Sequence, residues 1–346
     1  MTTEIAIIGD RFLRAAYFED ALQRACGDDL ICRKLDLAWP DVPMRHGYAE
    51  PGLAGLKEYL GEPAEVLAHV GRAPILVTHL APLSAEMFAR LPDLRLVAVS
   101  RGGPVNIDMA AARERGVTVV NAPGRNASAV AEFTLGAILA ETRNITRGHD
   151  ALRGGTWRGD LYRADATGEE LSALRVGVIG YGAIGQRVVR LLRAFAAEVL
   201  VADPYVTLSA EDAAAGVRQV DLKTLLGASD VVTLHARVTE ETTGFMDAAA
   251  FAAMKPGATF INTARGPLVD YDALYAALAD GHLRGAMLET FAVEPVPADG
   301  KLLRLPNVTL TPHIAGASLT TVRRAAGMMA EEVRRHLAGA PPLNPC

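Results

Sequence analysis

Three glycines at positions 180, 182 and 185 follow a short apolar run, residues 176–179. Apolar residues then recur at helical spacing, so the glycines are predicted to join a buried strand to a helix. In such a turn the first glycine allows the tight bend, the second lets a pyrophosphate approach the backbone, and the third lets helix and strand pack closely. The helix start also favours an anion. The predicted dinucleotide contacts are Gly180, Gly182, Ala183, Ile184 and Gly185.

A carboxylate follows the next predicted strand at the spacing expected of a ribose-binding acid. The apolar run 198–202 ends in Asp203, which lies 203 − 185 = 18 residues after the last glycine, close to the usual distance of about 20. Its carboxylate can accept both ribose hydroxyls and would repel a 2′-phosphate, and residues 204–208 contain no Lys or Arg. The sequence therefore predicts NAD rather than NADP. The alternative is an ordinary glycine-rich turn, with Asp203 as a helix cap.

Three polar clusters lie just after predicted strands, at residues 262–266, 289–295 and 311–316. At these clusters the chain resembles the D-isomer-specific 2-hydroxyacid dehydrogenases, which include D-lactate, glycerate, hydroxypyruvate and 3-phosphoglycerate dehydrogenases. The glycine motif, the segment Asn-Thr-Ala-Arg-Gly-Pro-Leu-Val-Asp from residue 262, the Glu-Pro pair at 294 and the segment Thr-Pro-His-Ile-Ala-Gly from residue 311 occur in the family's order and spacing. The resemblance covers nearly the whole chain.

The resemblance implies three catalytic residues, and each residue type suits its role. Arg265 matches the arginine that binds the substrate carboxylate, which a planar guanidinium can hold with two parallel hydrogen bonds. His313 matches the acid and base, because a resting pKa of about 6.5 allows proton transfer in both directions. Glu294 matches the carboxylate that orients this histidine and raises its pKa. Each residue alone has an ordinary alternative, as a surface cation, a core histidine or a helix cap.

The resemblance also implies further cofactor contacts. Thr263 and Ala264 are expected beside the cofactor. Glu289 stands where the family usually has an aspartate by the nicotinamide amide, and it is one methylene longer. His235 follows a predicted strand, where it either lines the cofactor cleft or has a structural role.

The N-terminal part carries the expected substrate contacts. The loop 101–106 resembles a family loop that offers backbone N–H groups to the substrate carboxylate, although it is shorter; Gly102 and Gly103 retain that ability. His79 follows a predicted strand and is either a substrate contact or a solvated loop histidine. A phosphate-bearing substrate would need more cations, and the candidates are Arg45, His46, His79 and Arg101.

The expected function is hydride transfer between NAD(H) and a small D-2-hydroxy acid or 2-keto acid. One alternative is an NAD(H)-sensing scaffold, since a transcriptional corepressor resembles this family; the sequence has no long disordered tail for partner docking, which disfavours it. Formate dehydrogenases also resemble the family but pair their histidine with glutamine, and Glu294 argues against that activity. Phosphite oxidation on the same fold stays open, because those enzymes keep the glutamate.

The elements that position these residues alternate between strands and helices, which predicts parallel sheets. The expected fold is α/β, with two Rossmann-like or flavodoxin-like domains and an inter-domain cleft. Residues 124–316 form the predicted NAD-binding domain. Residues 1–123 plus 317–346 form a discontinuous substrate domain, to which the C-terminal helix returns. Ser84 is expected to cap a helix.

One long helix is predicted over residues 127–147, and it is apolar on more than one face. Such a helix is either deeply buried or packed against a second subunit, so we expect a homodimer through it.

Composition narrows the class of protein further. The chain has 346 residues, half of them hydrophobic, with a net charge of −5 and no Lys/Arg run, so no nucleic-acid partner is expected. No apolar run reaches 18 residues and no basic signal start is present, which predicts no membrane association. The three cysteines have no metal spacing and suit a reducing cytoplasm, so no metal site is expected.

Overall fold

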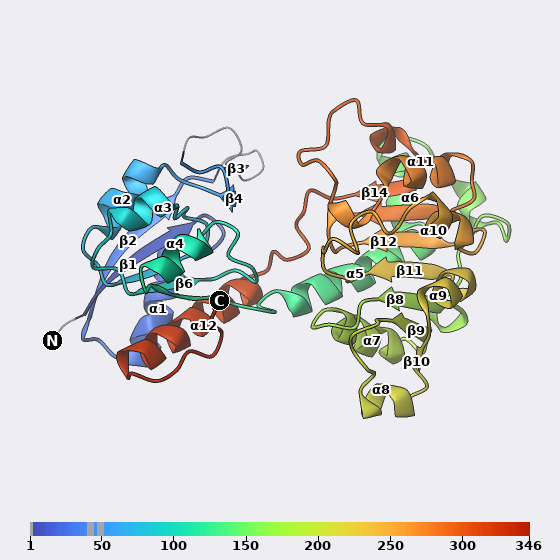
Figure 1. Cartoon of the computed structure of the whole chain (residues 1–346). Helices are drawn as coiled ribbons and strands as arrows, with labels where there is room; N and C mark the ends of the chain where they lie inside the picture. Colours follow the sequence, from blue (N-terminus) through green and yellow to red (C-terminus); the bar gives the residue numbers. More distant parts are fainter. Residues whose placement is uncertain (1–2, 40–44, 47–51) are drawn as a thin grey trace. The chain divides into compact units, whose positions relative to one another are not determined.

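The computed structural model describes residues 3–39, 45–46 and 52–346. The chain divides into two compact units (Figure 1). Unit 1 comprises Met1–Asn126 with Ala317–Cys346, and unit 2 comprises Ala127–Gly316. The predicted domain boundary at residue 123 lies three residues before the observed one, 126 − 123 = 3.

Unit 1 is built on a parallel five-stranded sheet. Its order, β2-β1-β5-β6-β7, reverses direction along the chain between β1 and β5. The strands are β1 Thr3–Asp10, β2 Leu30–Leu37, β5 Ile75–Thr78, β6 Leu96–Val99 and β7 Thr118–Val120. A separate antiparallel pair joins β3 Arg45–His46 to β4 Lys57–Tyr59.

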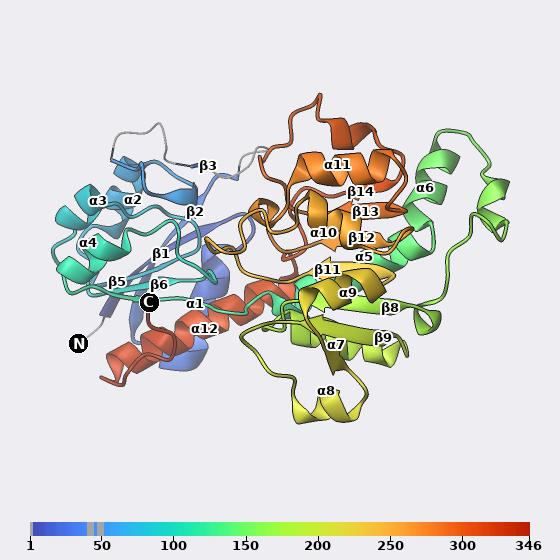
Figure 2. The same cartoon turned by 45° about the vertical axis from the view of Figure 1, so that its right-hand side comes forward.

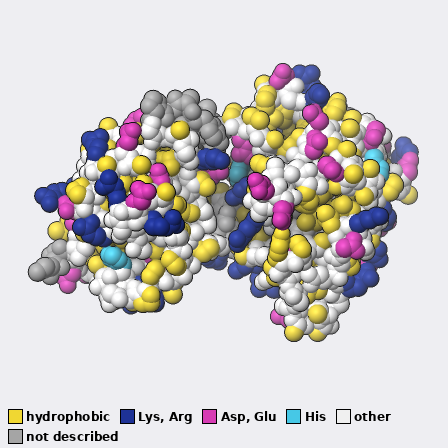
Figure 3. Space-filling view, viewed as in Figure 1, with side chains coloured by type: hydrophobic (Ala, Val, Ile, Leu, Met, Phe, Trp, Pro, Cys, Tyr) yellow, Lys and Arg dark blue, Asp and Glu magenta, His cyan; other side chains and the backbone are white. Residues whose placement is uncertain are grey.

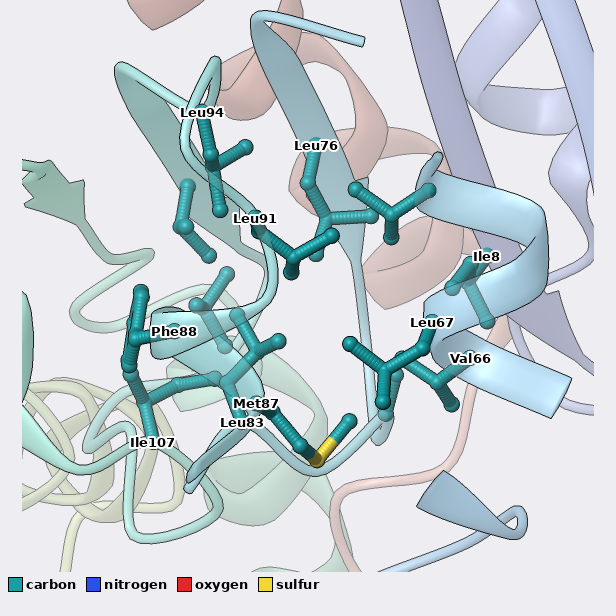
Figure 4. Close-up of a cluster of buried hydrophobic side chains, with 14 of the residues drawn as sticks. Ile8, Val66, Leu67, Leu76, Leu83, Met87, Phe88, Leu91, Leu94 and Ile107 are labelled. Atoms are coloured by element: carbon teal, nitrogen blue, oxygen red, sulfur yellow. The ribbon is translucent and has the colours of Figure 1, made fainter. Parts of the chain in front are cut away.

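Helices cover both faces of this sheet. One face packs against α1 Ala15–Cys26 and the C-terminal α12 Leu319–Leu337, which belongs to unit 1. The other face packs against α2 Pro63–Val70, α3 Ala85–Ala89 and α4 Met109–Glu114. Figure 4 shows this second core, where Leu67 and Met87 from helices face Leu76 from the sheet. The Ser84 hydroxyl accepts the N–H of Met87, which confirms the predicted cap of α3.

Unit 2 contains a parallel seven-stranded sheet in the order β10-β9-β8-β11-β12-β13-β14, which reverses between β8 and β11. The predicted class of two parallel-sheet α/β domains is therefore confirmed. The strands are β8 Arg175–Ile179, β9 Glu198–Ala202, β10 Arg218–Gln219, β11 Val231–Leu234, β12 Thr259–Asn262, β13 Gly285–Leu288 and β14 Val308–Leu310.

Two helical layers sandwich the unit 2 sheet (Figure 2). Alternate residues of the strands point to α5 and α7 on one face and to α9, α10 and α11 on the other. The helices are α5 Ala127–Thr142, α6 Ile145–Arg153, α7 Gly185–Ala194, α8 Ala210–Ala214, α9 Leu222–Ala228, α10 Ala248–Ala253 and α11 Tyr271–Ala279. Short 3₁₀ turns are η2 Gly159–Tyr162, η3 Leu171–Ala173, η4 Gly266–Leu268 and η5 Lys301–Arg304.

The prediction of one helix over residues 127–147 was wrong. Helix α5 ends at Thr142, and α6 begins at Ile145. Asn144 between them has a left-handed backbone with φ of 56°, a conformation that asparagine tolerates better than most residues. Its amide donates to the Ala166 carbonyl and its oxygen accepts from Arg284, so distant contacts hold the break.

Charged side chains of both signs are interspersed over the face shown in Figure 3. Within the described ranges, no helix combines the length and apolar character needed to cross a membrane.

Candidate active site

The glycine turn of unit 2 has the geometry that its sequence predicts. Gly180 adopts φ of 95°, and a Cβ there would meet the backbone of His235 at 2.7 Å. Gly185 begins α7, and its Cβ would lie 2.0 Å from the Gly180 carbonyl oxygen, so only glycine permits this approach of helix and strand. Gly182 is exposed, and a Cβ on it would meet no atom within 4 Å. The turn thus leaves open backbone where a pyrophosphate must approach.

Asp203 lies at the end of β9, beside this turn. Its Oδ2 accepts the N–H of Tyr181 at 2.7 Å, and its Oδ1 accepts the N–H groups of Tyr205 and Val206 at 2.8 and 3.0 Å. Because an ionised carboxylate has about four acceptor sites, roughly one remains for a ligand. Asp203 therefore fixes the loop after β9 and brings a negative charge next to the glycine turn.

His235 follows β11, at the point where the strand order of unit 2 reverses. Its Nε2 is 3.1 Å from the Thr233 hydroxyl, while its buried Nδ1 has no partner in the described part of the chain. Burial lowers the pKa of His235 to about 3, so the ring is neutral. In open parallel sheets, ligands bind at this reversal point. An open Gly182 and an unsatisfied His235 together fit a dinucleotide.

Thr263 and Ala264, which follow β12, are both buried. The Thr263 hydroxyl lies 2.8 Å from that of Thr134 in α5, and the Ala264 N–H donates to the Asn262 side chain at 3.0 Å. These contacts hold the loop that carries the neighbouring Arg265.

His313 and Glu294 form a hydrogen-bonded pair. Nδ1 of His313 lies 2.9 Å from Oε2 of Glu294, whose Oε1 accepts the N–H of Phe291 at 2.9 Å. His313 has φ of 53°, which is uncommon for a residue other than glycine, and its N–H points to the carbonyls of Glu289 and Thr311 at 3.0 and 3.1 Å. The backbone contacts and Glu294 together fix the direction of the imidazole.

The contact between His313 and Glu294 shifts the pKa of both side chains. Burial lowers the pKa of His313, but the hydrogen bond and charge of Glu294, with the charge of Glu289, raise it, and the pKa lies above its ordinary value. Burial raises the pKa of Glu294, yet the hydrogen bond and charge of His313, with the N–H of Phe291 and the charge of Arg265, together outweigh this and the pKa is lowered. The His313 side chain is 36% exposed. An accessible imidazole that protonates readily is suited to proton transfer.

Arg265 is exposed and its Nη1 donates to the Ala264 carbonyl at 2.7 Å. Its charge lowers the pKa of both Glu294 and His313, which places the guanidinium in their electrostatic neighbourhood. Arg265, Glu294 and His313, the three residues that the family resemblance proposes for catalysis, all lie in unit 2.

Glu289 is 1% exposed, and its Oε1 accepts the N–H of Ala315 at 2.7 Å. Burial raises its pKa, against the hydrogen bond from Ala315 and the charge of His313. This carboxylate ties β13 to the loop of His313. The sequence did not indicate that contact, because the two residues lie 26 positions apart.

Unit 1 holds the other predicted site residues. Gly102 and Gly103 are exposed, and a Cβ on either would meet no atom within 4 Å. His79 is buried, with Nδ1 at 2.6 Å from Oδ2 of Asp10 and Nε2 at 3.1 Å from Nη2 of Arg125. Sequence reasoning missed Asp10 and Arg125, which carry no recognisable motif.

Of the four candidate cations for a phosphate group, the structure describes the side chains of two, and both have partners. The side chains of Arg45 and His46 lie outside the described part of the molecule. Arg101 pairs with Glu58, and the buried His79 contacts Asp10 and Arg125. Within the described ranges, no cluster of three or more His, Cys, Asp or Glu residues could hold a metal.

Comparisons with known proteins agree with this geometry. Residues 135–315 match the protein family described as D-isomer specific 2-hydroxyacid dehydrogenase, NAD binding domain. A glyoxylate reductase of Thermofilum pendens is 34% identical over 318 residues, covering 88% of this chain and 94% of that protein. The D-3-phosphoglycerate dehydrogenase of Mycobacterium tuberculosis (strain H37Rv) is 40% identical over 276 residues, covering 80% of this chain; the match spans about half, 51%, of its length.

Solved structures show the same fold. The structure of a D-2-hydroxyisocaproate dehydrogenase superposes with a TM-score of 0.82 at 26% identity, and the match covers 99% of both chains. The chain therefore belongs to the D-isomer specific 2-hydroxyacid dehydrogenase family, an NAD-dependent class of oxidoreductases that act on small 2-hydroxy and 2-keto acids. These matches favour dehydrogenase activity over the sensing and phosphite-oxidising alternatives.

Proposed function

We propose that this chain interconverts a D-2-hydroxy acid and its 2-keto acid, with His313 as acid and base, Glu294 as its partner and Arg265 as the carboxylate receptor. The observation that carries the proposal is the 2.9 Å bond between His313 Nδ1 and Glu294 Oε2. Because Nδ1 is engaged, Nε2 is the atom that exchanges a proton with the substrate oxygen.

Each of the proposed residues has its own role in the reaction. In reduction, protonated His313 gives its Nε2 proton to the carbonyl oxygen, and the charge of Glu294 stabilises the imidazolium beforehand. In oxidation, neutral Nε2 takes the hydroxyl proton. The nicotinamide, when bound, supplies or accepts the hydride. Arg265 holds the carboxylate with its planar fork, which orients the reacting carbon. The N–H groups of Gly102 and Gly103 are proposed as additional carboxylate donors.

The cofactor contacts are proposed for the carboxyl edge of the unit 2 sheet. The backbone from Gly180 to Gly185 would hold the pyrophosphate, and Asp203 would accept a ribose hydroxyl and disfavour a 2′-phosphate. His235 Nδ1, with no partner among the described residues, is available to the cofactor. Thr263, Ala264 and Glu289 would shape the nicotinamide end.

We further propose that the enzyme is cytoplasmic. We also propose that two copies of the chain form a homodimer through α5 of unit 2. Phe133, Leu135 and Leu139 on this helix remain partly exposed in the single chain. Light scattering on the purified protein tests the assembly, and a monomer at micromolar concentration would count against it.

The deciding experiment is a screen of 2-keto acids with NADH and NADPH, which follows the loss of reduced nicotinamide. We expect turnover with NADH and a lower kcat/KM with NADPH. Asp203→Asn removes the charge at nearly constant size and should narrow that preference by about tenfold, the effect of about 1.4 kcal/mol. Absence of turnover with every 2-keto acid, while NADH still binds, would end the proposal.

A further inference from the structure

Arg125 belongs to a cluster at the carboxyl edge of the unit 1 sheet that the proposed catalytic roles do not use. Its Nη2 donates to Nε2 of His79 at 3.1 Å, and His79 Nδ1 donates to Oδ2 of Asp10 at 2.6 Å. Oδ1 of Asp10 accepts the N–H groups of Phe12 and Leu13 at 2.9 and 2.8 Å. A chain of hydrogen bonds thus runs from the end of β1, past the end of β5, to the segment after β7.

The inner members of this chain are fixed and fully occupied. His79 is 3% exposed and Asp10 is 0% exposed. Burial lowers the pKa of His79, although the hydrogen bond and charge of Asp10 act to raise it. The imidazole is therefore neutral, with Nδ1 as donor and Nε2 as acceptor. Since both ring nitrogens are used, His79 has none left for a ligand, and its effect must pass through Arg125.

Arg125 is held in place but incompletely satisfied. Its carbonyl accepts Nη1 of Arg324 from α12 at 3.2 Å, which fixes the backbone. Its own Nη1 is buried and has no hydrogen-bond partner among residues 3–39, 45–46 and 52–346. Burial lowers the pKa of Arg125 to about 10, the charge of Arg101 acts in the same direction, and Asp10 opposes both. A buried guanidinium with an unpaired N–H is costly unless a ligand completes it.

The position of the cluster is that of a ligand site. The strand order of unit 1 reverses between β1 and β5. Asp10 ends β1, and His79 directly follows β5. In open parallel sheets, ligands bind outside the carboxyl ends of the strands at such a reversal. The unsatisfied arginine therefore lies where the topology of unit 1 favours binding.

We propose that Arg125 receives a second anionic group of the substrate, a carboxylate or a phosphate distant from the 2-hydroxy acid group. Asp10 and His79 are positioning residues for this receptor. The inference rests on the proposed dehydrogenase function and narrows its substrates to acids with two anionic groups. A guanidinium fork suits both anions, because each can accept parallel hydrogen bonds.

The test compares pairs of 2-keto acids that differ in whether they carry a second anionic group. One arm pairs 2-oxoglutarate with 2-oxopentanoate, and the other pairs 3-phosphohydroxypyruvate with hydroxypyruvate. We expect the wild type to favour the substrate with two anionic groups in one arm by at least about tenfold in kcat/KM, and that arm identifies whether the second group is a carboxylate or a phosphate. Arg125→Gln should lower this ratio by about 10- to 100-fold, mainly through KM, as expected from losing hydrogen bonds to a charged group.

Three further variants sharpen the result. Arg125→Lys keeps the charge without the fork and should restore part of the preference. His79→Gln should lower the ratio by a smaller factor, again through KM rather than kcat. Arg72→Gln removes an exposed arginine of the same unit, paired with Asp93, and should leave the ratio unchanged.

A wild type that prefers the substrate with a single anionic group in both arms, or an Arg125→Gln enzyme that keeps the wild-type preference for two anionic groups, overturns the inference. A second measurement needs no turnover. Thermal unfolding of the full chain is compared in phosphate, glutarate and chloride at equal ionic strength, because a bound ligand raises the midpoint. We expect phosphate or glutarate to raise the unfolding midpoint above its value in chloride by more in the wild type than in Arg125→Gln. An equal rise in the two proteins contradicts the anion site. If this difference appears but no 2-keto acid is reduced, the dehydrogenase proposal fails and the anion site stands.

Discussion

The two units each contain a histidine bonded through Nδ1 to a carboxylate, at 2.6 Å for His79 and Asp10 and at 2.9 Å for His313 and Glu294. The side chain of His79 is 4% exposed, and that of His313 is 36% exposed. Burial outweighs the carboxylate at His79 and lowers its pKa, whereas at His313 the hydrogen bond and charge of Glu294, together with the charge of Glu289, outweigh burial and raise its pKa. A histidine bonded to a carboxylate is therefore a neutral structural link in unit 1, whereas in unit 2 it is the group that we propose exchanges a proton with the substrate.

The second ring nitrogen separates the pairs further. Nε2 of His79 accepts from Arg125. In the part of the chain that the structure describes, Nε2 of His313 has no hydrogen-bond partner. Only the unit 2 histidine has a nitrogen that a substrate can reach.

The largest expected effect is on turnover. His313→Gln removes the proposed acid and base and should lower kcat by about 10²- to 10⁴-fold, with NADH affinity by fluorescence titration within about twofold. His149→Gln, at an exposed position in the same unit, is the control. Equal turnover in the two variants would remove His313 from the mechanism.

The unit 1 pair should affect stability instead. His79→Gln weakens a buried hydrogen bond to Asp10 and should lower the free energy of unfolding by about 1.5–3 kcal/mol, measured in urea. His313→Gln should change it by less than about 1 kcal/mol. If the two substitutions destabilise the chain equally, the contrast between the pairs is lost.

A smaller effect is expected when the partner of His313 is changed. Reduction needs the imidazolium, so its rate falls as pH rises through the raised pKa of His313. Glu294→Gln removes the charge that raises this pKa, so the fall should move to lower pH and the rate at neutral pH should drop about tenfold. An unmoved pH profile in kcat/KM contradicts the assignment of Glu294.

The smallest effect is the slope of stability with pH. The folded pKa of His79 is lowered, so the unfolded chain binds the extra proton, and stability should decrease as pH falls below the ordinary value of 6.5. The folded pKa of His313 is raised, so its contribution is present at low pH and lost as pH rises through that pKa. His79→Gln should therefore flatten the acid side of the stability curve, and an unchanged slope argues against a neutral buried His79.

Local patterns explain which sequence predictions succeeded. The glycine turn follows from residue spacing, because its steric demands arise within a few residues of the chain. Helix 127–147 was predicted unbroken from the helical spacing of residues such as Val130 and Ile138. The break at Asn144 depends instead on Ala166 and Arg284, which lie 22 and 140 positions away. The tie between Glu289 and Ala315 was missed for the same reason.

By itself the sequence determined the alternation of strands and helices and the cofactor turn, since these depend on periodicity and a short motif. Arg265, Glu294 and His313 became candidates through the resemblance of their segments to a known family. Only the tertiary structure decided that His79 is enclosed and that Arg125 is left with an unsatisfied nitrogen. Asp10 and His79 are 69 positions apart, and His79 and Arg125 are 46 apart. Burial and hydrogen-bond partners at such separations arise from the order of strands in the sheet, which no local pattern in the chain encodes.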